Sequence, residues 1–169
     1  MFVSQDRYTA TVVALVQECG ADVSAAEEEV FTTLMLAAQD GHTATVVALV
    51  KTCGADVNAT NKDGDAALIT AVTSGFTKTV VVLMKECGAD RNAANKIAVT
   101  ALMRAALNGH TAAVVALAQE YGADVNAADK NGSTALMGAV QNGHTAKVVA
   151  WFIALMIAAQ NGRVVPTCQ

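Results

Sequence analysis

The chain has 169 residues, of which 53% are apolar and only 4% aromatic, and its formal net charge is −4. A disordered chain would combine low hydrophobicity with high net charge, so this composition excludes one. The apolar residues are mostly alanine and valine, which disfavours a large β-sandwich because alanine is depleted in strands. The length allows about one ordinary domain, and we expect it to be compact and helical.

The first residues and the apolar runs of the chain predict an intracellular protein. Residues 1–7 lack a basic stretch followed by an apolar one, so no secretory signal is expected. The longest apolar run, residues 148–159, is shorter than the roughly 20 residues that a membrane-spanning helix needs. We therefore expect this run to be buried core, with no membrane contact, and a cytoplasmic location with the nucleus as an alternative.

A 34-residue period organises the chain. The motif Gly-Ala-Asp recurs with this spacing at Gly20, Gly54, Gly88 and Gly122. A second motif, Gly-His-Thr-Ala, occurs at residues 41–44, 109–112 and 143–146, with residues 75–78 as a degenerate copy. A fixed period of this length indicates a solenoid or an array of stacked units.

Each period predicts a first helix, a tight loop, a second helix and a turn, in that order. The first helices begin at residues 32, 66, 100 and 134. Threonine can cap the helices at residues 32, 100 and 134. Ala66 has no capping hydroxyl, but the neighbouring Asp65 could cap that helix instead. Each ends about nine residues later at the glycine of the second motif, and each second helix ends at the Gly-Ala-Asp glycine. Residues 61–64 and 129–132 predict hairpin-like turns, because Asp-Gly and Asn-Gly adopt positive φ readily. The turn sequence is degraded at residues 27–30 and 95–98.

These motifs resemble the ankyrin repeat family, most closely in residues 132–144 (GSTALMGAVQNGH) and 122–127 (GADVNA). The resemblance covers essentially the whole chain and implies an all-α repeat solenoid of stacked helix-turn-helix units with hairpin-like turns. Tetratricopeptide repeats share the 34-residue period, but their helices are longer and no extended turn separates them. The family's usual period is 33, so one extra residue is expected in or just after the second helix.

We expect a single ankyrin repeat domain over residues 1–165. It would comprise a truncated repeat (1–25), three full repeats (26–59, 60–93, 94–127), a shortened repeat (128–152) and a partial first helix (153–163), with a tail at 164–169. The alignment of residues 5–12 with residues 39–46 places the start of the chain inside a first helix. Residues 154–162 repeat residues 135–143 after only 19 residues, which predicts one long or kinked terminal helix. Both ends thus fall inside a repeat, as expected for a fragment of a longer array.

Residues suited to disulfides, metals or catalysis occur once per repeat. They form ladders of cysteine (Cys19, Cys53, Cys87), histidine (His42, His110, His144) and aspartate (Asp22, Asp56, Asp90, Asp124). Units stacked about 8–10 Å apart exceed the roughly 7 Å Cα separation of a disulfide, and one ligand per layer cannot surround a zinc ion. We therefore predict reduced thiols, with imidazoles and carboxylates that bond the loop backbone. No enzyme activity, metal or cofactor is expected.

The resemblance implies that a partner binds a concave face made of the turn tips and the exposed sides of the first helices. Positions there that vary between similar repeats are not dictated by the scaffold, so we predict that they contact the partner. In the tips these are Lys62, Asp63, Asp65, Lys96, Ile97, Val99, Lys130, Asn131 and Ser133. The corresponding residues of the first tip are Glu28, Glu29 and Phe31. On the first helices they are Thr73, Ser74, Arg104, Leu107, Asn108, Gln141 and Asn142. The corresponding residues one repeat before Thr73 and Ser74 are Gln39 and Asp40.

Two features of this face have open interpretations. Lys62, Lys96 and Lys130 are either a solvated ladder or a site for an acidic partner. The apolar residues at nominally exposed positions either anchor a hot spot or reflect drift in a decaying repeat; they are Phe31, Ile97, Val99 and Leu107.

Two functions follow from these observations. The first is a non-catalytic protein–protein interaction module whose partner protein is unknown. The alternative is a structural segment of a longer array that has no partner of its own and self-associates through uncapped apolar ends. Nucleic-acid binding is disfavoured, because the chain is acidic, with a pI of about 5.2, and lacks interleaved aromatic and basic residues.

Overall fold

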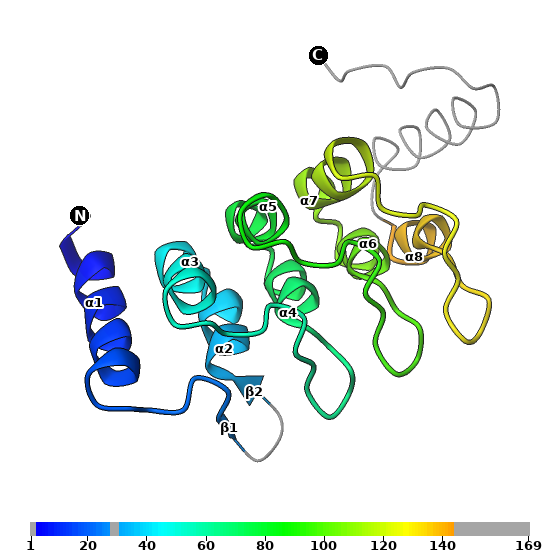
Figure 1. The fold of residues 1–169 in the computed structure, drawn as a ribbon. Helices are drawn as coiled ribbons and strands as arrows, with labels where there is room; N and C mark the ends of the chain where they lie inside the picture. The colour runs from blue at the N-terminus through cyan, green and yellow to red at the C-terminus, as the bar shows by residue number, and fades with distance from the viewer. Residues whose placement is uncertain (1–2, 28–30, 144–169) are drawn as a thin grey trace.

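The computed structural model describes residues 3–27 and 31–143, and the side chains of residues 8–25 and 31–143. Within these ranges the chain is a solenoid of antiparallel helix pairs stacked in a row (Figure 1). The tip glutamates Glu28 and Glu29, His144, and the terminal helix and tail predicted after residue 150 lie outside the described residues.

First and second helices form two parallel rows, as Figure 1 shows. The first helices are α2 (Thr33–Gln39), α4 (Ala67–Thr73), α6 (Ala101–Leu107) and α8 (Ala135–Gln141). The second helices are α1 (Val3–Gln17), α3 (Thr43–Lys51), α5 (Thr77–Lys85) and α7 (Thr111–Val115), which continues as a π-helix over Ala116–Glu120. Each helix packs against the next one in its own row.

Hairpin-like turns connect each second helix to the next first helix. The first turn contains the strand pair β1 (Ala26–Glu27) and β2 (Phe31–Thr32), which are antiparallel. The later turns close with single bridges at the equivalent positions, which are Thr60–Ala66, Ala94–Thr100 and Ala128–Thr134. The predicted repeat solenoid with hairpin-like turns is therefore confirmed.

The core runs continuously along the row of helices. Equivalent leucines of successive first helices, Leu34, Leu68 and Leu102, are at most 2% exposed. The equivalent valines of the second helices are fully buried: Val46, Val80 and Val114. The alanines between them are buried as well, and their small side chains allow the helices to approach closely. This packing explains why the chain needs alanine more than aromatic residues.

The predicted helix caps form in only two of the four repeats. The hydroxyl oxygens of Thr32 and Thr100 accept the N–H groups of Met35 and Met103, both at 3.3 Å. Thr134 makes no such bond, so that predicted cap is wrong. Asp65 does not substitute for the missing hydroxyl at Ala66 either, because its carboxylate accepts a hydrogen bond from the next turn instead.

The extra residue of the 34-residue period lies in the last turn of each second helix. There one backbone N–H donates to the carbonyl five residues earlier, instead of four, at 3.0–3.2 Å. The donors are Cys19, Cys53, Cys87 and Tyr121. Such a π-type turn accommodates a single added residue within a helix. After α7 the same widening extends into the π-helix.

The ladder cysteines stand at these widened turns. Cys19 is exposed, Cys53 is half-buried, Cys87 is buried, and all three are free thiols, as predicted. Burial raises the pKa of the Cys87 thiol, and the positive charge of Lys51 opposes this in part. Burial therefore makes the Cys87 thiol poorly reactive, because it limits access and disfavours the thiolate.

The first repeat differs from its prediction. Residues 3–6 were expected to lie in a first helix, but they form the beginning of α1, which continues without a break to residue 17. Arg7 and Tyr8 replace the glycine and histidine found at residues 41–42. Without that glycine nothing ends the helix at this point. The expectation of a first helix there is therefore wrong.

Candidate functional site

The three turn tips after the first are built in the same way. A side-chain oxygen of the first tip residue, Asn61, Asn95 or Asp129, accepts the backbone N–H groups two and four residues further on. These bonds are 2.8–3.1 Å long. Each tip is thus held in one conformation by its own side chain.

Neighbouring tips are also joined through their backbones. The N–H of Lys96 donates to the carbonyl of Asp63 at 3.0 Å, and that of Lys130 to the carbonyl of Ile97 at 3.1 Å. The side chains of these four residues are nevertheless exposed. The tips therefore present freely accessible side chains on a preorganised backbone.

One tip contains a strained residue. Ala98 has a φ of +64°, where the equivalent positions are Gly64 and Gly132. A left-handed backbone costs an L-residue about 1–2 kcal/mol. Ile97, directly before Ala98, is 55% exposed. The turn at residues 95–98 therefore keeps the conformation of the other tips, although its sequence is degraded. The backbone of Ala98 is strained as a result, next to the exposed side chain of Ile97.

The structure places the predicted partner-binding residues at two levels of exposure. The exposed set comprises Lys62, Asp63, Thr73, Ser74, Lys96, Ile97, Lys130, Asn131, Gln141 and Asn142. The half-buried set comprises Asp65, Val99, Arg104, Leu107, Asn108 and Ser133. Phe31 and Val99 pack against the core, so among the four apolar residues only Ile97 is mainly exposed.

Three of the predicted residues use their polar groups to join neighbouring repeats. The Asp65 carboxylate accepts a 2.9 Å hydrogen bond from the Asn95 amide. The amides of Asn108 and Asn142 donate to carbonyl oxygens at the end of the preceding first helix, at 3.2 and 2.8 Å. These groups position the scaffold and are already engaged before any partner arrives.

Arg104, in contrast, has a polar group that no neighbouring repeat engages within the described residues. Its side chain projects from α6 at the position that Thr70 occupies in α4 and Gly138 in α8. Its Nε is buried and has no hydrogen-bond partner in the described part of the chain. Arg104 thus brings an unsatisfied donor to the middle of the concave face.

Two of the hollows in the described part of the chain lie between neighbouring repeats, one at the first helices and one at the second helices. The smaller, of about 140 Å³, lies between α2 and α4 on the concave face and brings Asp65, Thr73 and Ser74 together with Phe31, Gln39 and Thr70. It does not include the predicted residues of α6 and α8.

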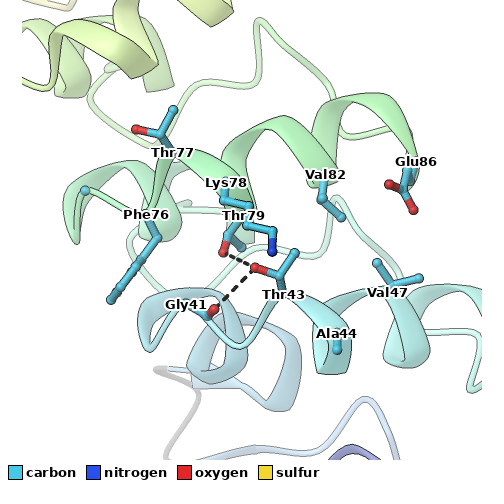
Figure 2. A pocket seen from close by; sticks show the side chains of 11 residues that line it. Gly41, Thr43, Ala44, Val47, Phe76, Thr77, Lys78, Thr79, Val82 and Glu86 are labelled. Carbon is cyan, nitrogen blue, oxygen red and sulfur yellow. Dashed lines mark hydrogen bonds between the residues drawn. The ribbon is translucent and has the colours of Figure 1, made fainter. Parts of the chain in front are cut away.

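The larger hollow was not predicted from the sequence. It has a volume of about 630 Å³ and lies between α3 and α5, where Figure 2 shows Val47 and Val82 along one part and Phe76 at one end. A 3.0 Å hydrogen bond between the hydroxyls of Thr43 and Thr79 joins the two helices. A signal was present in the sequence, because Phe76 stands where three other repeats have histidine, at His42, His110 and His144.

The aspartate ladder has the predicted structural role. Asp22, Asp56, Asp90 and Asp124 each accept the N–H two residues further on, at 2.8–2.9 Å. Hydrogen bonds from the hydroxyl and the N–H of Ser24 lower the pKa of Asp22. Two asparagines connect successive members of the ladder. The side-chain oxygen of Asn58 accepts the N–H of Asp90, and that of Asn92 accepts the N–H of Asp124, so each bond joins one repeat to the next.

The predicted role of the histidines is wrong for the two that the structure describes. Neither His42 nor His110 forms a side-chain hydrogen bond within the described ranges. The His110 ring instead covers Gly75, where an added Cβ would lie 2.8 Å from the ring. No group of three potential metal ligands occurs among residues 3–27 and 31–143. In the same ranges, no helix combines the length and apolarity required to cross a membrane.

Comparison with known proteins agrees with this architecture. The family model described as "Ankyrin repeats (3 copies)" matches residues 1–95 and again residues 79–153. A search among curated proteins found no match. Ankyrin repeats are generally protein–protein interaction modules and typically have no enzymatic activity. The two matches together cover most of the chain, which therefore belongs to the ankyrin repeat family.

Proposed function

We propose that this protein is a non-catalytic module, formed by one domain over residues 1–165, that binds a partner protein through its concave face. The binding site comprises the tips around Lys62, Lys96 and Lys130 together with the exposed sides of α4, α6 and α8. The observation that carries the proposal is the unpartnered, buried Nε of Arg104 in the middle of this face.

An unsatisfied buried donor is unfavourable, by about 1–3 kcal/mol and more for a charged group. A carboxylate from a partner would pair with the guanidinium, which binds carboxylate through two parallel hydrogen bonds. Within residues 31–143 the scaffold does not provide such a group. The hydroxyl of Thr73 donates to the backbone of its own helix at 2.8 Å, and Asp65 is engaged by Asn95.

The surroundings of Arg104 favour a partner that is acidic and also partly apolar. Lys62, Lys96 and Lys130 are exposed and form no ion pair within the described residues. Ile97 offers an apolar side chain of the kind that is buried at the centre of an interface. Because the tips are already rigid, binding would require little further ordering of the backbone.

The proposal is tested by comparing proteins retained from an extract of the source cells by three immobilised forms of the chain. These are the wild type, Lys96→Glu/Arg104→Glu on the concave face, and Lys78→Glu/Lys85→Glu on α5. Lys78 and Lys85 are exposed, so the control makes the same change in charge on the other side of the molecule. Circular dichroism establishes that all three forms are folded.

We expect the concave-face variant to lose the proteins that the wild type retains and the α5 variant to keep them. Unchanged retention by the concave-face variant would overturn the proposal. Loss only in the α5 variant would transfer the binding site to the hollow between α3 and α5 that Figure 2 shows.

A further inference from the structure

We propose that the partner inserts a cationic side chain, that of a lysine or an arginine, into the hollow between α2 and α4. This hollow lies one repeat away from Arg104, which binds a carboxylate of the same partner segment. The inference rests on the function proposed above and deepens it. The partner would be recognised by two opposite charges at a fixed spacing.

The hollow between α2 and α4 exists because two positions of that repeat carry short side chains. Thr70 stands where the next repeat has Arg104, whose stem lies in the corresponding space between α4 and α6, since its Nε is buried. Ser74 stands where the next two repeats have Asn108 and Asn142, whose amides bond a carbonyl of the preceding first helix. The space that Arg104 occupies between α4 and α6 is thus open between α2 and α4.

The hollow has the size of one side chain. Its volume is about 140 Å³. A protein cavity of roughly 150 Å³ holds a single benzene molecule. Thr73 and Ser74, which line the hollow, are exposed, so it can be entered from the solvent. One side chain of a bound segment therefore fits, whereas a whole helix does not.

The charge at the hollow suits a cation. The Asp65 carboxylate lines it and accepts the 2.9 Å hydrogen bond from Asn95 through Oδ1. The second oxygen, Oδ2, forms no hydrogen bond within the described residues and is not buried. No basic residue lines the hollow. Phe31 also lines it, and its ring offers apolar contact to the methylene stem of a lysine or arginine.

Two further polar groups at the hollow are free to accept hydrogen bonds. The side chains of Gln39 and Ser74 form none within the described residues. An amide oxygen and a hydroxyl oxygen both accept from an ammonium or a guanidinium group. The hydroxyls of Thr70 and Thr73 instead donate to backbone carbonyls of the α4 repeat, at 3.2 and 2.8 Å. An incoming cation therefore has acceptors on Asp65, Gln39 and Ser74.

The charge of the concave face changes sign between this hollow and Arg104. Three carboxylates are replaced by uncharged side chains one repeat later: Asp40 by Ser74, Asp63 by Ile97, and Asp65 by Val99. At a fourth position the neutral Thr70 is replaced by Arg104. The tip lysines Lys62 and Lys96 occur in both repeats and do not contribute to the difference. A complementary partner therefore carries its positive charge toward α2 and its negative charge toward α6.

The distance between the two sites sets the spacing of these charges. Packed helices lie about 8–10 Å apart, and an extended chain advances about 3.3 Å per residue. About three residues of an extended segment therefore span one repeat. We expect the basic and the acidic residue of the partner to be separated by this number of positions.

The test is selection of peptides from a random display library by the immobilised full chain. Two variants exchange the residues of equivalent positions. Thr70→Arg fills the hollow with the side chain that α6 already accommodates, and Arg104→Thr removes the basic site. Ala112→Arg is the matched control for the added charge, because Ala112 is exposed on α7, where the equivalent residue of α5 is Lys78. Circular dichroism establishes that all forms are folded.

We expect the wild type and Ala112→Arg to enrich peptides that carry a basic and an acidic residue at the expected spacing. Thr70→Arg should lose the preference for the basic residue and keep that for the acidic one. Arg104→Thr should do the reverse. Unfolding cannot explain such complementary losses, because each variant keeps half of the specificity.

A second measurement tests the charge of Asp65 without filling the hollow. Asp65→Asn removes the negative charge, and its amide oxygen can still accept the hydrogen bond from Asn95. Fluorescence anisotropy compares the best peptide selected by the wild type with a copy in which alanine replaces the basic residue. We expect Asp65→Asn to weaken binding of the first peptide by about three- to tenfold and to leave that of the second unchanged.

The possible outcomes separate this inference from the function proposed above. Enrichment of acidic residues without any basic preference would overturn the inference and leave the binding role of Arg104 intact. A basic preference that persists in Thr70→Arg would also overturn the inference, as would apolar residues in place of the basic one. An acidic preference that persists in Arg104→Thr would contradict the role of Arg104, and both proposals with it.

Discussion

The first helices α2 and α4 have closely related sequences but different surroundings. Both bury a leucine at the same position, Leu34 and Leu68, at no more than 2% exposure. Two residues further on, Leu36 of α2 is 41% exposed, whereas Thr70 of α4 is 8% exposed. The larger apolar side chain is thus on the helix that no first helix precedes within residues 3–27 and 31–143, and the smaller polar one is enclosed.

This comparison shows that burial in a repeat protein is set by the neighbouring repeat as much as by the helix itself. A helix with neighbours on both sides gains packing energy from two interfaces, whereas an end helix gains it from one. The same substitution should therefore have different effects in the interior and at the end.

The largest difference is expected between two leucine truncations. Leu68→Ala removes a side chain that is 1% exposed and should destabilise the protein by about 2–5 kcal/mol through the resulting cavity. Leu36→Ala should cost less than about 1 kcal/mol, because water already reaches that side chain. Denaturant unfolding at low protein concentration measures both. Equal losses would mean that the front of α2 is covered in solution.

The next effect concerns the glycines that end the second helices. Gly88 has a φ of +73° and open space around an added Cβ, so Gly88→Val tests backbone strain alone, and we expect a loss of about 1–3 kcal/mol. Gly20 has the same geometry, with a φ of +72°, but lies in the end repeat. Gly20→Val should lower the melting temperature less, since an end repeat unfolds locally at lower cost. An unchanged melting temperature for Gly88→Val would contradict the assigned helix end.

The smallest expected change in stability comes from exchanging glycine and alanine at two interior tips, those of Gly64 and Ala98. Ala98→Gly relieves a left-handed alanine and should stabilise the protein by about 0.5–1 kcal/mol, after the entropic cost of glycine is subtracted. Gly64→Ala should destabilise it, because the added Cβ would lie 2.7 Å from the backbone nitrogen of Lys96. Thermal unfolding of the two variants measures the difference. Destabilisation by Ala98→Gly would show that the strain at this tip is compensated by contacts of the alanine methyl group.

Much of the local structure could be predicted from the residues themselves. The 34-residue period predicted the order of helices, and the glycines of the two repeated motifs predicted where most helices end. The aspartate bonds of the Gly-Ala-Asp loops were also predictable, because a short carboxylate side chain reaches an N–H two residues away. These features all depend on interactions within a few residues of sequence.

The candidate site was predicted less completely. Variation between repeats identified Arg104 and Ile97, but it also identified Asn108 and Asn142, whose amides bond the preceding first helix. A variable position on the face of a repeat can join the scaffold when its partner lies in the next repeat, some 35 residues away in sequence. The hollow between α3 and α5 was missed for the same reason, because it exists only between two repeats.

The repeat family, the period and the alternation of first and second helices can all be recognised in the residues, since regular spacing of glycine, alanine and leucine dictates helices that bury one side. Which polar groups are satisfied and which helix faces are covered became visible only in the packed solenoid. It showed that Arg104 Nε has no partner among the described residues, that α1 continues through the expected loop, and that Leu36 is exposed. Hydrogen-bond satisfaction and burial depend on pairs of neighbouring repeats, and a pattern within one repeat does not contain that information.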